Sequence, residues 1–139
     1  MVLGVPSRLC FHGVAVSGRG EARGFTTLSW VQEEFWGKLG FRPCPGTLNI
    51  QLSFPEEART LKRLIELWGI EITPREGFCA AKTLPAVLRG ISCAVIRPQV
   101  PGYPEEVTEI MAPVHLRERL DIAEGDRVIL EIALPVQNL

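Results

Sequence analysis

Two polar residues, Thr47 and Asn49, stand two positions apart at the start of a strand that we predict over residues 47–52. Residues two apart on a strand face the same way, so the Thr47 hydroxyl and the Asn49 side-chain carbonyl can converge on one point. Both are neutral oxygens, and Mg²⁺ accepts one or two protein oxygens when water and substrate phosphates complete its coordination. Two polar residues on an exposed strand face would give the same pattern, so the pair alone does not identify a metal site.

A glycine-rich segment, Gly18-Arg19-Gly20-Glu21-Ala22-Arg23-Gly24, precedes this pair. Glycines allow the backbone to approach a ligand closely and to point amide N–H groups at an anion. Arg19 and Arg23 add positive charge, and Glu21 adds a carboxylate between them. Arg23 occupies the place of the third glycine in a GxGxxG motif, and no convincing helix follows directly, so dinucleotide binding is not supported. A hairpin loop with solvated charges remains the plainer explanation.

The third candidate segment runs from Glu109 to Arg117 and reads EIMAPVHLR. Pro113 is placed to start a short helix, whose free N–H groups can meet an anion or a base edge, and Arg117 follows one turn later. His115 can serve as a general base, although a histidine at the surface explains it equally well. A single carboxylate such as Glu109 is usually exposed or ion-paired.

The elements that must position these residues follow from hydrophobic periodicity. We expect one helix over 30–39, with Ser29 as its N-cap and Gly40 at its end. A second helix over 55–68 starts with Pro55. Its apolar stripe indicates core packing and consists of Ala58, Leu61, Leu64, Ile65 and Trp68. The remaining apolar runs are strand-length, and a short helical segment and a tight turn complete the list: strands 9–16, 47–52, 78–84, 91–96, 107–111 and 128–134, one or two helical turns in 113–120, and a turn at 124–126. Short strands that do not alternate regularly with helices favour a mainly β fold, a compact barrel covered by helices.

Composition restricts the class of protein. The chain has 139 residues, of which 46% are hydrophobic and 22% charged, with a formal net charge of -1. This is ordinary globular composition, and we expect a single domain over residues 1–139. No segment approaches the ~20 apolar residues of a membrane helix, and no signal peptide pattern opens the chain. Zinc binding is poorly supported because no CxxC pair occurs, and we expect buried or half-buried thiols in a cytoplasmic protein at Cys10, Cys44, Cys79 and Cys93.

Taken together, the three segments are more specific than any one of them. The ordered motifs VSGRGEARGF, LGFRPCPGTLNIQL and EIMAPVHLRERLDIAEGDRV closely resemble the CTP-dependent riboflavin kinase family of archaea. The resemblance extends from about Phe11 to Ile132 and is weakest over 53–75. It implies a compact six-stranded cradle-loop β-barrel with two or three covering helices. It also implies transfer of the γ-phosphoryl group of CTP to the 5′-hydroxyl of riboflavin, which gives FMN and CDP with Mg²⁺ as cofactor.

The resemblance also implies roles for individual residues. Thr47 and Asn49 match the metal ligands of the family, and Glu109 matches a flavin-contacting glutamate. Two segments match nucleotide-contacting positions, namely Arg19, Gly20, Glu21, Ala22, Arg23 and Gly24, and Val114, His115, Leu116 and Arg117. Glu21 and Glu109 are the candidates for a catalytic general base.

The chain departs from the family pattern before Glu109. Pro101 falls at the position of a flavin-contacting Thr by ungapped count, and Tyr103 is displaced from the usual place of a neighbouring Tyr. A proline offers neither an N–H group nor a hydroxyl. Ala22 also replaces a glycine of the family loop.

Other functions remain open at this point. A member of the family that binds flavin or nucleotide without catalysis would be compatible with Pro101, and the fold would also allow a different nucleotide donor. The segment LDIAEGDRVILEI resembles the end of a cradle-loop DNA-binding regulator, but the net charge of -1 and scattered arginines disfavour nucleic acid. We expect a monomer whose partners are riboflavin or FMN and CTP or CDP, with no nucleic acid and no membrane.

Overall fold

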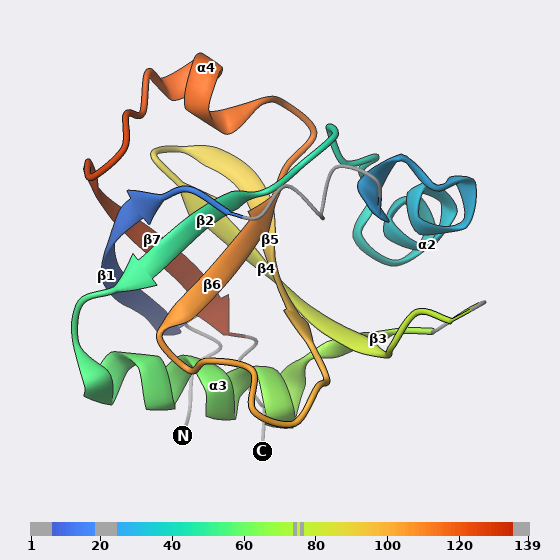
Figure 1. Ribbon diagram of the computed structural model, residues 1–139, viewed down its shortest axis with the longest axis horizontal. Helices are drawn as coiled ribbons and strands as arrows, with labels where there is room; N and C mark the ends of the chain where they lie inside the picture. The colour runs from blue at the N-terminus through green and yellow to red at the C-terminus, as the bar shows by residue number, and fades with distance from the viewer. Residues whose placement is uncertain (1–6, 19–24, 74, 76, 135–139) are drawn as a thin grey trace, which may run out of the picture.

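The computed structural model describes residues 7–18, 25–73, 75 and 77–134. Its antiparallel sheet has the strand order β3-β4-β5-β6-β2-β1-β7, and pairing of β4 with β7 closes six of the seven strands into a barrel. The strands are β1 (Ser7–Val16), β2 (Leu48–Leu52), β3 (Ile70–Ile72), β4 (Ala81–Leu88), β5 (Ile91–Pro98), β6 (Val107–Met111) and β7 (Arg127–Leu134). Strand β3 lies outside the closed barrel, beside β4 (Figure 1). The prediction of a mainly β, six-stranded barrel is confirmed.

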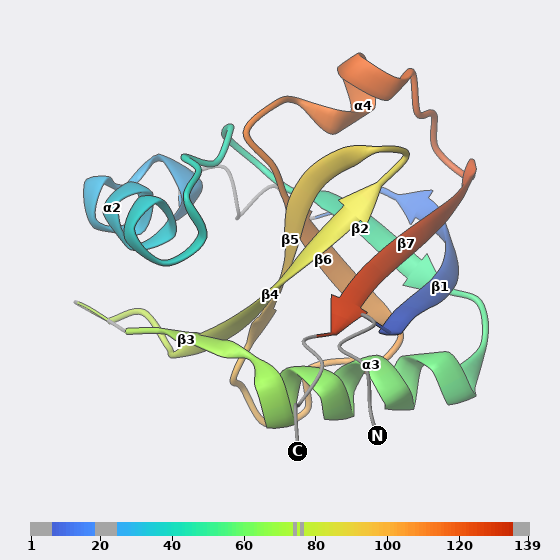
Figure 2. The same cartoon turned by 180° about the vertical axis from the view of Figure 1, so that it is seen from behind.

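Three labelled helices surround the barrel. They are α2 (Ser29–Leu39), α3 (Pro55–Trp68) and α4 (Leu116–Leu120). Helix α3 crosses one end of the barrel, α4 lies near the opposite end, and α2 lies to one side (Figures 1 and 2). No helix among the described residues is long and apolar enough to span a bilayer.

The barrel interior is built by alternation along the strands. In β2 the residues Leu48, Ile50 and Leu52 are buried, whereas the residues between them are half-buried. Alternate residues of β1 and β7 point into the same cluster, and α3 closes it with Ala58, Leu61 and Ile65. Each fully buried leucine or isoleucine contributes about 1.5–3 kcal/mol by leaving water, so this interior holds the strands that carry the site.

A second, smaller cluster holds α2 against the barrel. Val31 and Phe35 of α2 are fully buried. They pack with side chains of the β3–β6 strands, namely Ile72, Ala81, Ala94, Ile96 and Met111. Because α2 is followed by the loop that leads to β2, this packing fixes where the predicted metal-binding strand begins.

The helix over 55–68 and the strand over 107–111 occur with the predicted bounds. Other predictions need correction. Ser29 is the first residue of α2 and not its N-cap, because Leu28 holds the cap position without a side-chain hydrogen bond. Trp68, predicted to pack in the core, is 44% exposed, because Gly69 ends the helix and the chain turns into β3.

The strand bounds also differ near β4. We predicted a strand over 78–84, but β4 starts at Ala81 and continues through Pro85 to Leu88. Proline was taken as a strand end because it cannot donate to the ladder; here Pro85 is exposed and pairs opposite Ala94. Strand β3 was not predicted, because three residues are too few to show alternation. Of the four free cysteines, Cys93 is buried and Cys44 half-buried as expected, but Cys10 and Cys79 are exposed.

Candidate functional site

A cleft of about 940 Å³ opens beside the ends of β1, β2 and β6. Its lining includes every predicted site residue that lies within the described part of the chain: Thr47, Asn49, Pro101, Glu109, Val114, His115, Leu116 and Arg117. Arg19, Gly20, Glu21, Ala22, Arg23 and Gly24 lie outside the described residues. Val16, Ser17 and Gly18, which lead into that segment, line the same cleft. Residues separated by as many as 101 positions in sequence, Val16 and Arg117, therefore meet at one place.

Strand pairing explains this convergence. In the β2–β6 ladder Asn49 lies opposite Glu109, and in the β1–β2 ladder it lies opposite Val16. Strand β2 thus carries the predicted metal-binding residue Asn49. On one side β6 carries the Glu109 carboxylate, and on the other side β1 leads into the glycine-rich segment. Thr47 directly precedes β2 and lines the cleft together with Asn49, as the spacing of two residues indicates.

Glu109 is the centre of a short hydrogen-bonded chain. The Tyr103 hydroxyl donates to its Oε2 at 2.5 Å, and the Thr47 hydroxyl donates to its Oε1 at 3.3 Å. Burial raises the pKa of Tyr103 above its ordinary value, and the hydrogen bond to Glu109 and its negative charge raise it further, while Arg97 opposes them. Tyr103 is therefore a neutral donor at physiological pH.

The hydroxyl of Thr47 is suited to a further contact. A threonine hydroxyl has one donor hydrogen and two acceptor lone pairs. Because the hydrogen is directed to Glu109, the lone pairs remain available to an electrophile in the cleft. Among the described residues, no three His, Cys, Asp or Glu side chains gather into a metal-binding group. Hard oxygen donors are nevertheless present at Thr47 and Asn49, with the Glu109 carboxylate beside them, and this donor set fits Mg²⁺ when phosphates supply further oxygens.

Gly18 allows the close approach of β1 to the Asn49 side chain. A Cβ atom on Gly18 would lie 2.9 Å from Asn49 Cγ and would overlap its amide nitrogen. Only a residue without a side chain fits there unless Asn49 moves. The first glycine of the glycine-rich segment therefore has a definite steric role, which is to leave room for Asn49.

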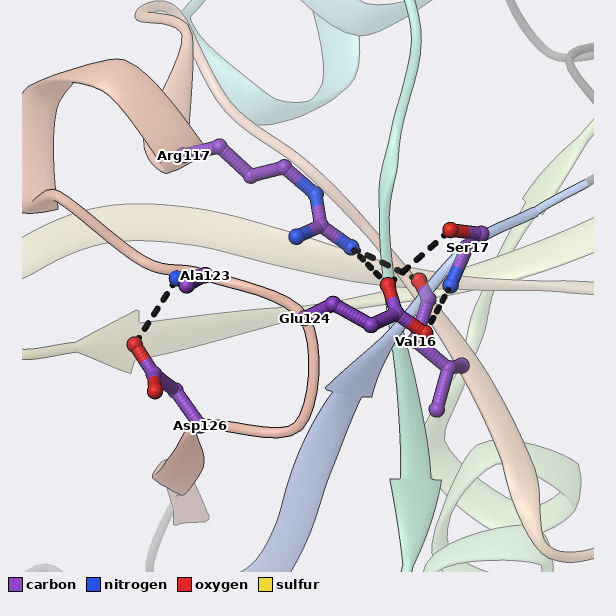
Figure 3. A network of polar contacts seen from close by, with 6 residues as sticks. All are labelled: Val16, Ser17, Arg117, Ala123, Glu124 and Asp126. Carbon is purple, nitrogen blue, oxygen red and sulfur yellow. Dashed lines mark hydrogen bonds and ion pairs between the residues drawn. The ribbon is translucent and has the colours of Figure 1, made fainter.

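The opposite side of the cleft is held by the contacts of Arg117, Ser17 and Glu124 (Figure 3). Arg117 donates to the Val16 carbonyl at 2.8 Å, and its guanidinium lies 3.7 Å from Glu124. Glu124 accepts a hydrogen bond from the Ser17 hydroxyl at 2.9 Å and another from the Ser17 N–H at 3.2 Å. These contacts tie the end of β1 to α4 and to the turn before β7.

That turn was predicted at 124–126 and is present. Gly125 has a φ of +84°, and the Asp126 carboxylate accepts from the Ala123 N–H at 2.7 Å. Backbone hydrogen bonds also join it to Ala15 of β1. The turn therefore has a second role, because it positions the Glu124 carboxylate to accept the hydrogen bonds from Ser17.

The segment 113–117 differs from its prediction. Helix α4 begins at Leu116, so Pro113 does not start it, and His115 precedes it as an exposed residue in extended conformation. The Cys44 N–H donates to the carbonyl of Ala112, which keeps the chain extended after β6. Leu116 is 5% exposed and packs in the barrel core, although it also lines the cleft. A helix of five residues offers no substantial anion site at its N-terminus.

Sequence reasoning missed three contributors to this cleft. Tyr103 was considered only for its shift from the usual place of a family tyrosine, and no direct role was assigned to it; it lines the cleft with its hydroxyl on Glu109. Glu124 was assigned only to a turn. Arg97 was not singled out, although it is 8% exposed and contacts the turn that carries Tyr103. Its position at the end of an apolar run was the available signal, since an arginine next to buried strand residues needs partners.

Comparison with known proteins supplies the family. A family model named CTP-dep_RFKase, described as a domain of unknown function (DUF120), matches residues 15–132. The chain belongs to the CTP-dependent riboflavin kinase family. The match runs from the end of β1 into β7 and contains every residue that lines the cleft, so the sequence-based assignment to this family is confirmed.

Individual relatives agree with this assignment. The riboflavin kinase of Methanoregula boonei is 37% identical over 128 residues, which are 87% of this chain and 56% of that protein. The riboflavin kinase of Archaeoglobus fulgidus is 37% identical over 126 residues, 88% of this chain and 54% of that protein. That of Methanosarcina mazei is 35% identical over 132 residues, 91% of this chain and 58% of that protein. The chain thus spans little more than half the length of these relatives.

Proposed function

We propose that the chain is a CTP-dependent riboflavin kinase. It transfers the γ-phosphoryl group of CTP to the ribityl 5′-hydroxyl of riboflavin, so that a new O–P bond forms, the bond to the β-phosphate oxygen breaks, and FMN and CDP leave. The observation that carries the proposal is the convergence of Thr47, Asn49 and Glu109 with the 114–117 segment on one cleft. The relatives of this family that bear the name riboflavin kinase support it.

We assign riboflavin to the side of the cleft formed by the turn Val100–Pro104 together with Glu109, and we call this side the flavin end. Val100, Pro101 and the Tyr103 ring supply apolar surface for a flat ring system. Glu109 supplies a hydrogen-bond acceptor for a hydroxyl or N–H group of the flavin. Pro101 contributes surface only, since it lacks the hydroxyl of the threonine expected in the family.

We assign CTP to the side formed by Val16–Gly18 and Val114–Arg117, the nucleotide end. The glycine-rich residues 19–24 follow directly from Gly18, so Arg19, Arg23 and their backbone N–H groups are expected to contact the phosphates. His115 and the 114–117 backbone are the candidates for contact with the cytosine. Arg117 donates to the Val16 carbonyl, and its side chain, which lines the cleft, is 29% exposed, which leaves it able to face a phosphate or base.

Thr47 Oγ1 and the Asn49 side-chain carbonyl are the proposed ligands of Mg²⁺, which when bound would neutralise charge on the donor phosphates. Glu109 fixes the Thr47 hydroxyl by accepting its hydrogen. Gly18 leaves the space in which Asn49 lies. Most of the rate enhancement in this reaction class comes from positioning and charge stabilisation, which are the tasks that these side chains perform.

Glu109 and Glu21 are the two candidates for the general base. Glu109 lies in the cleft at the flavin end, beside Thr47, and each of its oxygens already accepts a hydrogen bond from the protein. That arrangement suits orientation of the acceptor hydroxyl. If the Glu109→Gln or the Glu21→Gln variant binds both substrates but loses turnover, the substituted residue is the general base. Normal turnover in both variants would contradict both assignments.

FMN formation tests the proposal directly. Riboflavin and Mg²⁺ are incubated with the folded protein and with CTP, ATP, GTP or UTP in parallel. We expect FMN with CTP ahead of the other donors. Riboflavin or nucleotide binding without FMN from any donor would instead support a non-catalytic binding protein, and an equal rate with another donor would overturn the preference for CTP. The expectations of a cytoplasmic monomer with no nucleic-acid or membrane partner stay predictions, as does the single-domain expectation for residues 1–139.

A further inference from the structure

Arg97 is the most deeply buried charged residue of the described chain. It lies near the end of β5 and is 8% exposed. None of the ion pairs found among the described residues includes it. Burial of a guanidinium without a carboxylate is costly unless its N–H groups find other acceptors. The identity of those acceptors therefore indicates what Arg97 is for.

The acceptors and the stacking partner of Arg97 all belong to one turn. Its Nη2 donates to the Tyr103 carbonyl at 2.9 Å, and its Nη1 donates to the Pro104 carbonyl at 3.3 Å. Its guanidinium carbon also lies 5.0 Å from the centre of the Tyr103 ring. Three contacts from one planar group thus fix both the backbone and the ring of the turn between β5 and β6.

This turn separates two cavities. One face of the turn lines the cleft, and the other face lines a smaller cavity of about 290 Å³ bounded by Lys62, Glu66 and Arg97. The turn is therefore not supported by solid packing from behind. From α3, Lys62 lies 3.5 Å from Glu105, but both side chains are half-exposed, and such a pair contributes little.

We propose that Arg97 is the positioning residue for the acceptor substrate, because it fixes the β5–β6 turn in the shape that presents Pro101 and Tyr103 to riboflavin. The inference rests on the proposed function and adds to it a residue that does not line the main cleft. Arg97 holds the Tyr103 ring, and the Tyr103 hydroxyl in turn holds Glu109 at 2.5 Å. A lysine cannot replace it, since an ammonium is a point charge without the planar fork that reaches two carbonyls while stacking.

Arg97→Lys and Arg97→Met test the proposal by riboflavin affinity. The dissociation constant is measured from the change in riboflavin fluorescence without nucleotide, and the KM values for riboflavin and CTP are measured separately. Loss of one or two buried hydrogen bonds predicts that riboflavin binding weakens about tenfold in Arg97→Lys, and further in Arg97→Met. The KM for CTP stays within about twofold, because the nucleotide end has its own anchors. Thermal unfolding of each variant establishes that the protein is folded, and Arg97→Lys carries the test if Arg97→Met does not fold.

Arg89→Lys is the matched control. Arg89 also donates to two backbone carbonyls, those of Arg127 at 3.0 Å and Leu120 at 3.5 Å, but it is exposed and lies outside the cleft lining. We expect its riboflavin affinity to equal that of the wild type. Unchanged riboflavin binding in both Arg97 variants would overturn the positioning role, and so would an equal rise in both KM values.

The binding readout also separates this inference from the proposed function. Wild-type protein that binds riboflavin but forms no FMN from any donor contradicts the kinase assignment alone. In that case weaker riboflavin binding by Arg97→Lys still supports the role of Arg97. Wild-type protein that does not bind riboflavin at all contradicts both.

Discussion

At the flavin end of the cleft a buried arginine holds the β5–β6 turn, whereas at the nucleotide end the half-buried Arg117 and the exposed Ser17 and Glu124 hold the end of β1. Arg97 is 8% exposed and donates to two carbonyls of its turn. Glu124, which accepts two hydrogen bonds from Ser17, has a side chain that is 60% exposed. Buried charge-assisted contacts are strong and insensitive to salt, whereas exposed ones are weak and screened.

This difference indicates that the two ends of the cleft differ in rigidity. On the proposed assignment of substrates, the flavin end is preorganised, so that a rigid ring system would meet a surface already in place. The nucleotide end is held by contacts that cost little to rearrange. A flexible triphosphate with several charged oxygens is better served by such adjustable anchors. Between the two ends Thr47 and Asn49 belong to neither, and changes there are expected to affect the reaction most.

Asn49→Ala therefore has the largest expected effect. Removal of the side-chain carbonyl takes away one of two proposed protein ligands of Mg²⁺, and turnover at limiting Mg²⁺ falls about 100-fold. Saturating Mg²⁺ restores part of the loss, while riboflavin binding in the absence of nucleotide is unchanged. FMN formation across a Mg²⁺ titration measures this. Normal activity of both Asn49→Ala and Thr47→Ala at limiting Mg²⁺ would show that the ligand assignment is wrong.

Gly18→Ala tests the contact between the nucleotide end and Asn49. The new methyl group overlaps the Asn49 amide and must displace that flexible side chain, because the other contacts in the way are also Asn49 atoms. We expect the Mg²⁺ concentration for half-maximal activity to rise about tenfold with little change in the unfolding temperature. Gly37→Ala is the control, since a Cβ at Gly37 meets nothing within 4 Å. Identical Mg²⁺ dependence in Gly18→Ala and Gly37→Ala would contradict the steric role.

Glu124→Gln sharpens the comparison at the nucleotide end. The two Ser17 hydrogen bonds reach different carboxylate oxygens, so the amide carbonyl keeps only one of them, and the negative charge beside Arg117 is lost. Exposed pairs contribute about 0.2–1 kcal/mol, so the KM for CTP rises only about two- to threefold and the KM for riboflavin does not change. The effect shrinks as salt is added. A tenfold or larger change that persists at high salt would mean that Glu124 is not the weak, exposed anchor described here.

Titration of Tyr103 is expected to have the smallest effect on activity. It reports directly on the burial and hydrogen bonding of a side chain at the flavin end. Tyr103 is the single tyrosine of the chain, so tyrosinate absorbance reports on it alone. Burial and Glu109 raise its pKa, so ionisation occurs above the ordinary value near 10. Because the pKa of Tyr103 is higher in the folded than in the unfolded protein, its neutral form contributes fully to the free energy of unfolding below about pH 10. That contribution is lost as pH rises through the pKa of the folded protein.

Tyr103→Phe is the reference for that titration. Burial also raises the pKa of Cys93, to about 12, and both proteins retain this contribution to alkaline unfolding. The loss of stability above pH 10 is therefore shallower in Tyr103→Phe than in the wild type. Ionisation of wild-type Tyr103 at its ordinary pKa would show that the ring is not enclosed by the turn.

Local sequence signals predicted the regular elements of the fold. Pro55 at the helix start, acidic residues in the first turn and Gly69 at its end define α3, and its bounds agree with the structure. Strand β6 was recognised in the same way from its apolar run. Strand β3 was missed because three residues carry no periodicity, and Trp68 is exposed because the chain leaves the core where the helix ends.

The site was predictable where its residues are neighbours in sequence, and not where side chains meet across the fold. Thr47 directly precedes β2 and Asn49 lies on it, and their spacing of two residues predicted that they lie together in the cleft. The bond from Tyr103 to Glu109 depends on the shape of the turn between β5 and β6, which no local pattern encodes. The bond from Ser17 to Glu124 joins residues 107 positions apart, and only the β1–β7 pairing brings them together.

The most direct test of the central claim compares both KM values in one variant from each end, Tyr103→Phe and Arg117→Ala. If the cleft is a riboflavin kinase site with two ends, Tyr103→Phe raises the KM for riboflavin and leaves that for CTP unchanged. Arg117→Ala does the reverse, raising the KM for CTP alone. A rise in the same KM in both variants, or a wild-type protein that forms no FMN, would contradict the account.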